Sequence, residues 1–157
     1  MVEVRLLSMT KKEFEVMMEG NVGRYADENV KAGYWSSYNA LERSREAIEH
    51  LLPNGLHTEG HHFYTAKDAD LDIPVGHIWM RVEPGEVRRG FIFALFVEEG
   101  FRGRGYGRAM MDALETKARR MKIESLALHV FAYNRVARHL YESLGYDTKS
   151  LNMQKKI

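Results

Sequence analysis

The sequence contains no cysteine and only three prolines among its 157 residues. The absence of cysteine excludes disulfide bonds, thiol nucleophiles and thiolate metal ligands. The sequence also lacks an apolar run long enough to span a membrane, and the opening stretch MVEVRLLSMT lacks the apolar core of a signal peptide. We therefore expect a cytoplasmic protein without a membrane-spanning segment.

Neither sign of charge dominates the chain. The 23 Lys and Arg residues nearly balance the 22 Asp and Glu residues, so no net field draws the protein to nucleic acid or to a membrane surface. Apolar residues make up 45% of the chain and charged residues 29%, which is typical of a soluble globular domain. We find no repeat, low-complexity tract or linker, and we expect residues 1–157 to form a single domain.

Apolar periodicity predicts the following elements. Residues 2–8 alternate as a strand, and Thr10 with Glu13 has the spacing of a capping box that begins a helix. A second helix is predicted from about residue 38 to residue 52. Three strands follow, at residues 61–66, 73–82 and 90–98. The remaining predictions are a helix at 104–122, a strand at 125–132, a helix at 134–144 and a last strand at 151–157.

The strand at residues 91–97 is apolar at every position, which is typical of a central strand covered on both faces. Strands and helices then alternate through residue 144, so a crossover connection and a parallel strand pair are expected. The earlier strands can pair as antiparallel neighbours. The predicted fold is α/β (α+β by some schemes), with a mixed sheet and helices on both faces.

The stretch EEGFRGRGYGRAMM, residues 98–111, places arginine where a helix begins. The start of a helix carries partial positive charge and favours acidic residues, so Arg102, Arg104 and Arg108 each cost some tenths of a kcal/mol, roughly, unless an anion offsets them. Glycines between a strand and a helix let backbone N–H groups approach a phosphate closely. The alternative is a solvated arginine cluster on a tight turn.

Two familiar phosphate-binding loops do not fit this stretch. A P-loop would require lysine where Tyr106 stands. A dinucleotide-binding loop read from Gly105 would require glycine or alanine where Met110 stands.

A third pattern fits. Residues 102–107, RGRGYG, match the R/Q-x-x-G-x-G/A signature of the GNAT (Gcn5-related N-acetyltransferase) superfamily, and residues 134–146, NRVARHLYESLGY, resemble the second half of that fold. The resemblance extends over residues 73–148, and the whole chain is similar to the YycN-type bacterial branch. It implies a GNAT fold, with a mixed, mostly antiparallel sheet of six to seven strands and about four helices on both faces.

The resemblance implies an acyltransferase that moves the acetyl group of acetyl-CoA directly to a primary amine, without a metal. In this superfamily the loop amides hold the pyrophosphate, and the strand before the loop pairs its backbone with the pantetheine arm. Asn134 matches the asparagine that bonds the pantetheine, although it also suits a helix N-cap. The residues implied to bind the cofactor are Leu95, Phe96, Val97, Arg102, Gly103, Arg104, Gly105, Tyr106, Gly107, Arg108, Asn134, Ala137 and Tyr141.

Two residues are candidates for catalysis. Tyr141 matches the tyrosine that donates a proton to the departing CoA thiolate, and the alternative is an ordinary amphipathic tyrosine. His129, five residues before Asn134, stands where some ribosomal-protein alanine acetyltransferases carry a catalytic glutamate, and the alternative is a structural histidine in a strand. No carboxylate interrupts residues 91–97, where histone-type relatives keep their base. The base is therefore left open between His129 and a water.

The acceptor amine is not identified by the sequence. Aromatic and histidine residues that could line its cleft, or belong to the core, are Tyr25, Tyr34, Trp35, Trp79 and His77. The nearby His57, His61 and His62 lack the helical spacing of a metal site, so no metal is expected. Two alternatives remain: a non-catalytic acyl-CoA sensor on the same fold, and a nucleic-acid-binding protein using RGRGYGR and KARRMK. Those runs lie at opposite ends of one helix, so we expect no nucleic-acid partner. A homodimer through exposed edge strands is compatible with the sequence.

Overall fold

A five-stranded sheet organises the chain in the computed structural model, which describes all 157 residues. The strands lie side by side in chain order, namely β1 (Val4–Ser8), β2 (His61–Asp68), β3 (Pro74–Val82), β4 (Arg89–Val97) and β5 (Ser125–Leu128). The first four strands pair antiparallel, and β5 runs parallel to β4. The predicted mixed, mostly antiparallel sheet is confirmed.

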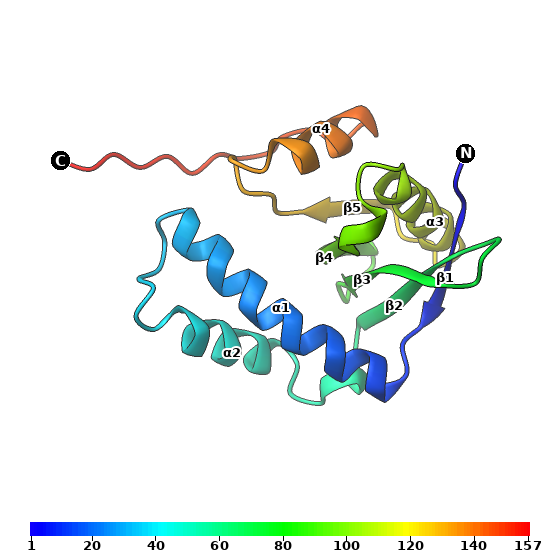
Figure 1. Cartoon of the computed structure of the whole chain (residues 1–157), viewed down its shortest axis with the longest axis horizontal. Helices are drawn as coiled ribbons and strands as arrows, with labels where there is room; N and C mark the ends of the chain where they lie inside the picture. Colours follow the sequence, from blue (N-terminus) through cyan, green and yellow to red (C-terminus); the bar gives the residue numbers. More distant parts are fainter.

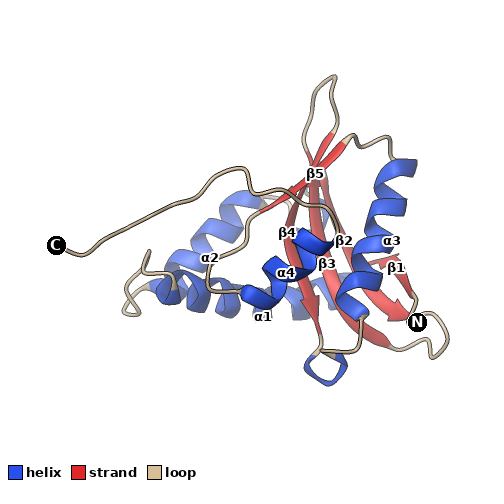
Figure 2. Cartoon of the chain, turned by 90° about the horizontal axis from the view of Figure 1, so that it is seen from above, coloured by secondary structure: helices blue, strands red, loops and turns tan.

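Four α-helices cover the sheet, as predicted. They are α1 (Lys11–Lys31), α2 (Ala40–Leu51), α3 (Tyr106–Arg120) and α4 (Arg135–Ser143), with 3₁₀ turns at Gly55–His57 and Glu99–Phe101. Figure 2 shows α1 and α2 on one side of the sheet and α3 on the other. None of these helices combines the length and apolarity needed to cross a membrane.

The predicted capping box is present and also ties α1 to the sheet. The Thr10 side chain accepts a hydrogen bond from the Glu13 N–H, and the Glu13 carboxylate accepts one from the Thr10 N–H at 2.9 Å. The second carboxylate oxygen of Glu13 accepts a hydrogen bond from the Thr65 hydroxyl of β2 at 2.8 Å. These bonds, that of the Thr10 backbone above all, lower the pKa of Glu13.

Both faces of β3 are buried because successive side chains of a strand point to opposite sides. Ile78 and Met80 pack with α3 residues such as Leu114. Trp79 packs on the other face with residues of α1 and α2, including Met17 and Ile48. The strand β3 is therefore covered on both faces.

Three expectations about the strands were wrong. The sheet has five strands rather than six to seven. β5 ends at Leu128 rather than near residue 132, because the chain bends away from β4 there. Residues 151–157 form no strand, since none of their backbone groups finds a partner within the chain. Figure 1 shows this C-terminal segment leading away from the body of the domain.

Candidate active site

The centre of the site is a gap between β4 and β5. These strands pair at only four positions, Arg89–Ile92 against Ser125–Leu128. Phe93 is an extra residue in β4, because Met80 of β3 faces Ile92 while Trp79 faces Ala94. Such a bulge bends a strand and alters its pairing. We call residues 93–97 and 129–131, which diverge beyond this point, the splay.

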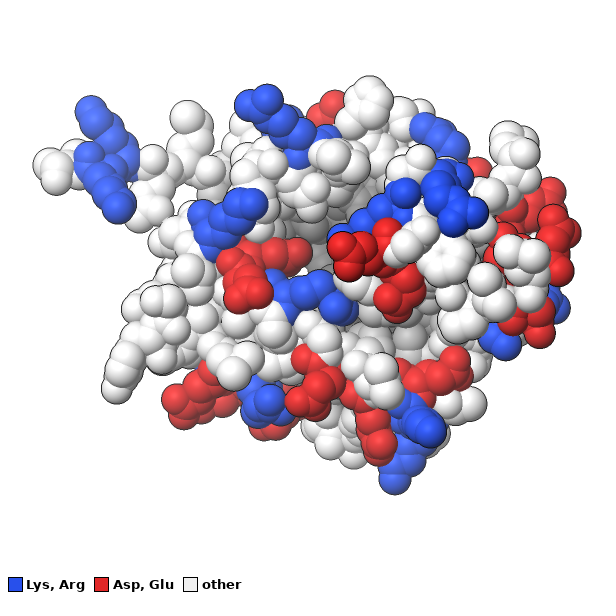
Figure 3. All heavy atoms as spheres, viewed as in Figure 1, with Lys and Arg blue, Asp and Glu red and all other residues white.

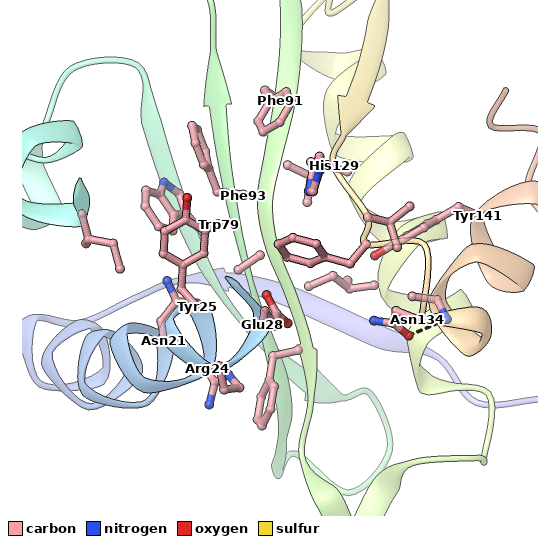
Figure 4. Close-up of a pocket in the computed structure, with 18 of the residues that line it drawn as sticks. Asn21, Arg24, Tyr25, Glu28, Trp79, Phe91, Phe93, His129, Asn134 and Tyr141 are labelled. Carbon is pink, nitrogen blue, oxygen red and sulfur yellow. Dashed lines mark hydrogen bonds between the residues drawn. The ribbon is translucent and has the colours of Figure 1, made fainter. Parts of the chain in front are cut away.

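The splay opens a cavity of about 360 Å³ with a mostly apolar lining. In Figure 4, Tyr25 and Glu28 enter it from α1, while Asn134 and Tyr141 enter from the α4 side. Figure 3 shows a hollow in this face of the molecule, with side chains of both charge signs around it. The remaining lining residues are Asn21, Arg24, Ile48, Leu51, Trp79, Phe91, Ile92, Phe93, Ala94, Leu95, Phe96, His129, Val130, Phe131 and Ala137.

The loop that enters α3 presents a row of free backbone N–H groups. No backbone N–H from residue 103 to residue 108 donates a hydrogen bond within the chain, and the Gly105 N-cap provides no side-chain acceptor. Gly103 and Gly105 have positive φ angles of 70° and 89°, which glycine adopts without strain. Unpaired N–H groups at the positive end of a helix dipole form an anion-binding arrangement.

The three arginines of the loop are exposed and pair with no carboxylate. Arg102 Nε donates to the Val97 carbonyl at 2.9 Å, and Arg104 donates to the Gly100 carbonyl at 3.3 Å. Arg108 donates to the Ser143 hydroxyl of α4. These bonds hold the arginines close to the loop, and none of the three forms a salt bridge with a carboxylate of the chain.

The tyrosine of the loop faces away from the solvent. Tyr106 is 2% exposed, and its hydroxyl donates to the Asp68 carboxylate at 2.6 Å. Asp68 also accepts from the backbone N–H groups of Asp70 and Leu71. The bond from Tyr106 is the largest cause of a lowered pKa at Asp68. The Tyr106 side chain therefore anchors the loop to the sheet, and only its backbone can contact a ligand at the loop.

The α4 side of the cavity combines a helix cap with a tyrosine. The Asn134 side chain accepts from the Ala137 N–H at 3.2 Å, so the N-cap role is present. Tyr141 also lines the cavity, and burial, with a smaller effect of Glu28, raises the pKa of Tyr141 to about 12. The hydroxyl of Tyr141 therefore holds its proton throughout the physiological pH range.

Comparison with known proteins gives the family. Residues 28–146, most of the chain, match the sequence model of the Acetyltransferase (GNAT) family. The chain belongs to the GNAT family.

Two relatives within the family resemble this GNAT protein over almost their whole length. Both come from Bacillus subtilis strain 168. The uncharacterised N-acetyltransferase YycN is 38% identical over 98% of this chain and 99% of its own. The uncharacterised N-acetyltransferase YdgE is 33% identical over 97% of each chain. The crystal structure of YycN superposes with a TM-score of 0.94 over 98% of both chains, which shows the GNAT fold.

The structure places the sequence-predicted GNAT residues in two groups, one that lines the cavity and one in the loop outside it. Leu95, Phe96, Asn134, Ala137 and Tyr141 line one cavity, and the loop at residues 102–108 begins α3 just after β4. Val97 does not line the cavity, but its carbonyl accepts the bond from Arg102.

The histidines and aromatic residues separate into two groups. His129 lines the cavity one residue beyond the end of β5, and its exposed ring contacts Phe131 edge to face at 4.8 Å. Tyr25 and Trp79 also line the cavity. Tyr34, Trp35 and His77 do not line the cavity, and His77 is buried, stacked on Phe96. His61 accepts a hydrogen bond from Trp79 Nε1 at 2.9 Å and so has a structural role.

Sequence reasoning missed the polar residues that α1 presents to the cavity, which are Asn21, Arg24 and Glu28. Their spacing of three and four residues, shared with Tyr25, places them on one helix face. That periodicity could have identified them. However, charged residues at helical spacing are more often a solvated surface, and only the tertiary structure turns this face toward the splay.

Proposed function

We propose that this GNAT protein transfers the acetyl group of acetyl-CoA to a primary amine while both substrates are bound. The observation that carries the proposal is the run of free N–H groups at residues 103–108, beside three arginines that lack carboxylate partners. A diphosphate is the ligand that would satisfy both features, since it accepts several hydrogen bonds and carries negative charge.

The splay fits the rest of acetyl-CoA. On its β5 side, the backbone of residues 93–97 has no strand partner. Apart from the Val97 carbonyl, which accepts from Arg102, its amide groups on that side are available to the amides of a pantetheine arm. Asn134 keeps its side-chain NH₂ free, because the N-cap bond uses only the side-chain oxygen. The thioester would then reach the cavity beside Tyr141, and it supplies the carbonyl carbon that the amine attacks.

The reaction requires two proton transfers. A carbon–nitrogen bond forms while the carbon–sulfur bond breaks, the amine nitrogen loses one proton and the sulfur gains one. We assign the proton donor to Tyr141, whose hydroxyl is protonated at neutral pH. Because its raised pKa makes it a weak acid, Tyr141 first stabilises the departing sulfur by a hydrogen bond and then gives up its proton. Among the residues predicted from sequence, His129 stands in the same cavity as a candidate base.

The test measures binding and turnover separately. Calorimetry with acetyl-CoA reports the cofactor site, and thiol release from acetyl-CoA across an amine library, with mass spectrometry of the product, reports the reaction. The proposal predicts both binding and an N-acetylated amine. Binding without turnover on any amine would instead indicate an acyl-CoA sensor, and the absence of binding would refute the assignment of the loop.

A further inference from the structure

The α1 side of the cavity has features that acetyl-CoA does not account for. Aromatic rings form a continuous wall there: Trp79 stacks on Phe93 at 4.7 Å between ring centroids, and Phe91 meets Phe93 edge to face at 4.9 Å. In Figure 4, Tyr25 and Asn21 extend from α1 toward Trp79 of this wall. Aromatic faces bind apolar groups and attract cations.

Glu28 is the only carboxylate in the cavity lining. It is half-buried, and it takes part in no ion pair or side-chain hydrogen bond within the chain. Its helical neighbour Arg24 lies over the Phe96 ring, 3.9 Å from the centroid, and does not form a salt bridge with Glu28. A half-buried carboxylate without a partner is costly unless a ligand supplies the counter-charge.

We propose that Glu28 binds the ammonium group of the acceptor, which releases one proton to solvent to become the attacking amine, and that Glu28 takes the second proton from the nitrogen as the carbon–nitrogen bond forms. The acceptor is a monoamine with an aromatic or branched apolar body. This rests on the proposed acetyl transfer. Glu28 and Tyr141 approach the cavity from opposite sides, which suits a base and an acid in one transfer. As the carbon–nitrogen bond forms, the nitrogen becomes far more acidic, so a carboxylate can accept its proton.

The charges of the lining select against polycations. One carboxylate can neutralise one ammonium group, while Arg24 would repel a second. The cavity of about 360 Å³ also has to hold the thioester end of the cofactor, which leaves space for one small apolar group. Polyamines and aminoglycosides, each with several cationic groups, therefore fit this site poorly.

The first experiment compares substrates of matched shape on the wild-type protein. Benzylamine carries one cation on an aromatic ring, p-xylylenediamine carries two on the same ring, and propylamine lacks the ring. We expect kcat/KM for benzylamine to exceed that of either other amine by about tenfold or more. A peptide with N-terminal phenylalanine distinguishes a free amine from a protein terminus as the source. A preference for the diamine would overturn the acceptor class.

The second experiment replaces the carboxylate. Glu28→Gln keeps the shape and removes the charge, so kcat/KM for benzylamine should fall roughly 10²–10⁴-fold with acetyl-CoA affinity nearly unchanged. Glu19→Gln, on the exposed side of the same helix, is the matched control and should behave as wild type. Wild-type kcat/KM in Glu28→Gln would overturn the role of Glu28. Absence of turnover in the wild-type protein itself would instead refute the proposed acetyl transfer.

The pH profile separates Glu28 from His129. Burial raises the pKa of Glu28, so kcat/KM should begin to fall at a higher pH than for an exposed glutamate. This acidic limb should disappear in Glu28→Gln and persist in His129→Ala. The reverse result would assign the base to His129. The titratable and charged groups that interact electrostatically with Glu28 are Arg24 and Asp27 on α1, Tyr133 just before α4, and Tyr141 on α4. His129 lines the same cavity.

Discussion

Two apolar stretches of neighbouring strands differ in how the chain covers them. Every residue from 75 to 80 in β3 is buried, whereas none from 93 to 97 in β4 is. β3 has a hydrogen-bonded neighbour on both sides, while β4 loses β5 after Ile92. The comparison indicates that an apolar sequence does not determine enclosure, because a strand also needs a backbone partner. We infer that acetyl-CoA takes the place of the missing strand beside residues 93–97.

The largest expected effects separate two tyrosines. Tyr141→Phe, in the splay, should lower kcat roughly 10²–10⁴-fold with acetyl-CoA binding nearly intact, because the proton donor is lost while the ring remains. Tyr106 is buried and lies outside the splay. Tyr106→Phe removes the hydrogen bond to buried Asp68 and should lower the free energy of unfolding while turnover persists. Steady-state kinetics and urea unfolding of both variants check this. Wild-type turnover in Tyr141→Phe, with chemistry shown to be rate-limiting, would contradict its role.

The next prediction uses two residues that face each other across β3 and β4, Ile78 and Leu95. Ile78 is fully buried, so Ile78→Ala should cost about 2–5 kcal/mol of unfolding free energy. Leu95 is only partly buried, so Leu95→Ala should cost clearly less but weaken acetyl-CoA binding. Denaturant unfolding and calorimetry measure the two effects. Equal stability losses with unchanged binding would show that the splay is ordinary core.

The stability of the protein should depend on pH through His77, which lies in β3. Burial, with a smaller effect of Arg24, lowers the pKa of His77 to about 4. Its pKa in the unfolded chain is about 6.5. The contribution of neutral His77 to the free energy of unfolding is therefore fully present above about pH 6.5. As the pH falls toward 4, the free energy of unfolding should decrease by about 3 kcal/mol. His77→Leu should remove this loss of stability. The substitution breaks no hydrogen bond of Nε2, because this buried atom has no hydrogen-bond partner. Unfolding free energies measured across this pH range for both proteins provide the check, and parallel curves would refute the assignment.

The smallest effect is predicted at the loop. Gly105→Asp places negative charge where N–H groups meet an anion, and acetyl-CoA affinity should fall at least tenfold, about 1.4 kcal/mol. Asp also has to adopt the positive φ of 89°, so Gly105→Asn, which shares that strain without the charge, is the control. Calorimetry should show a larger loss for Asp than for Asn. Equal losses would attribute the effect to strain.

Local pattern predicted much of this fold. The capping box at Thr10, the periodic helices and the three middle strands were confirmed, because each depends on neighbouring residues. The early end of β5 and the unpaired tail could not be predicted, because they depend on which edges meet in space. The RGRGYG loop was recognisable since its chemistry lies in consecutive residues. Glu28 was not, because β4 and α1 become neighbours only through folding.

The central claim is that acetyl-CoA binds where the chain leaves backbone groups unpaired. Amide hydrogen exchange, read by mass spectrometry with and without acetyl-CoA, tests it most directly. We predict that the cofactor slows exchange at residues 93–97 and 103–108, with little change in β1, β2 and β3, where the strands already pair. Protection that is absent from both segments, or confined to other parts of the chain, would contradict the account.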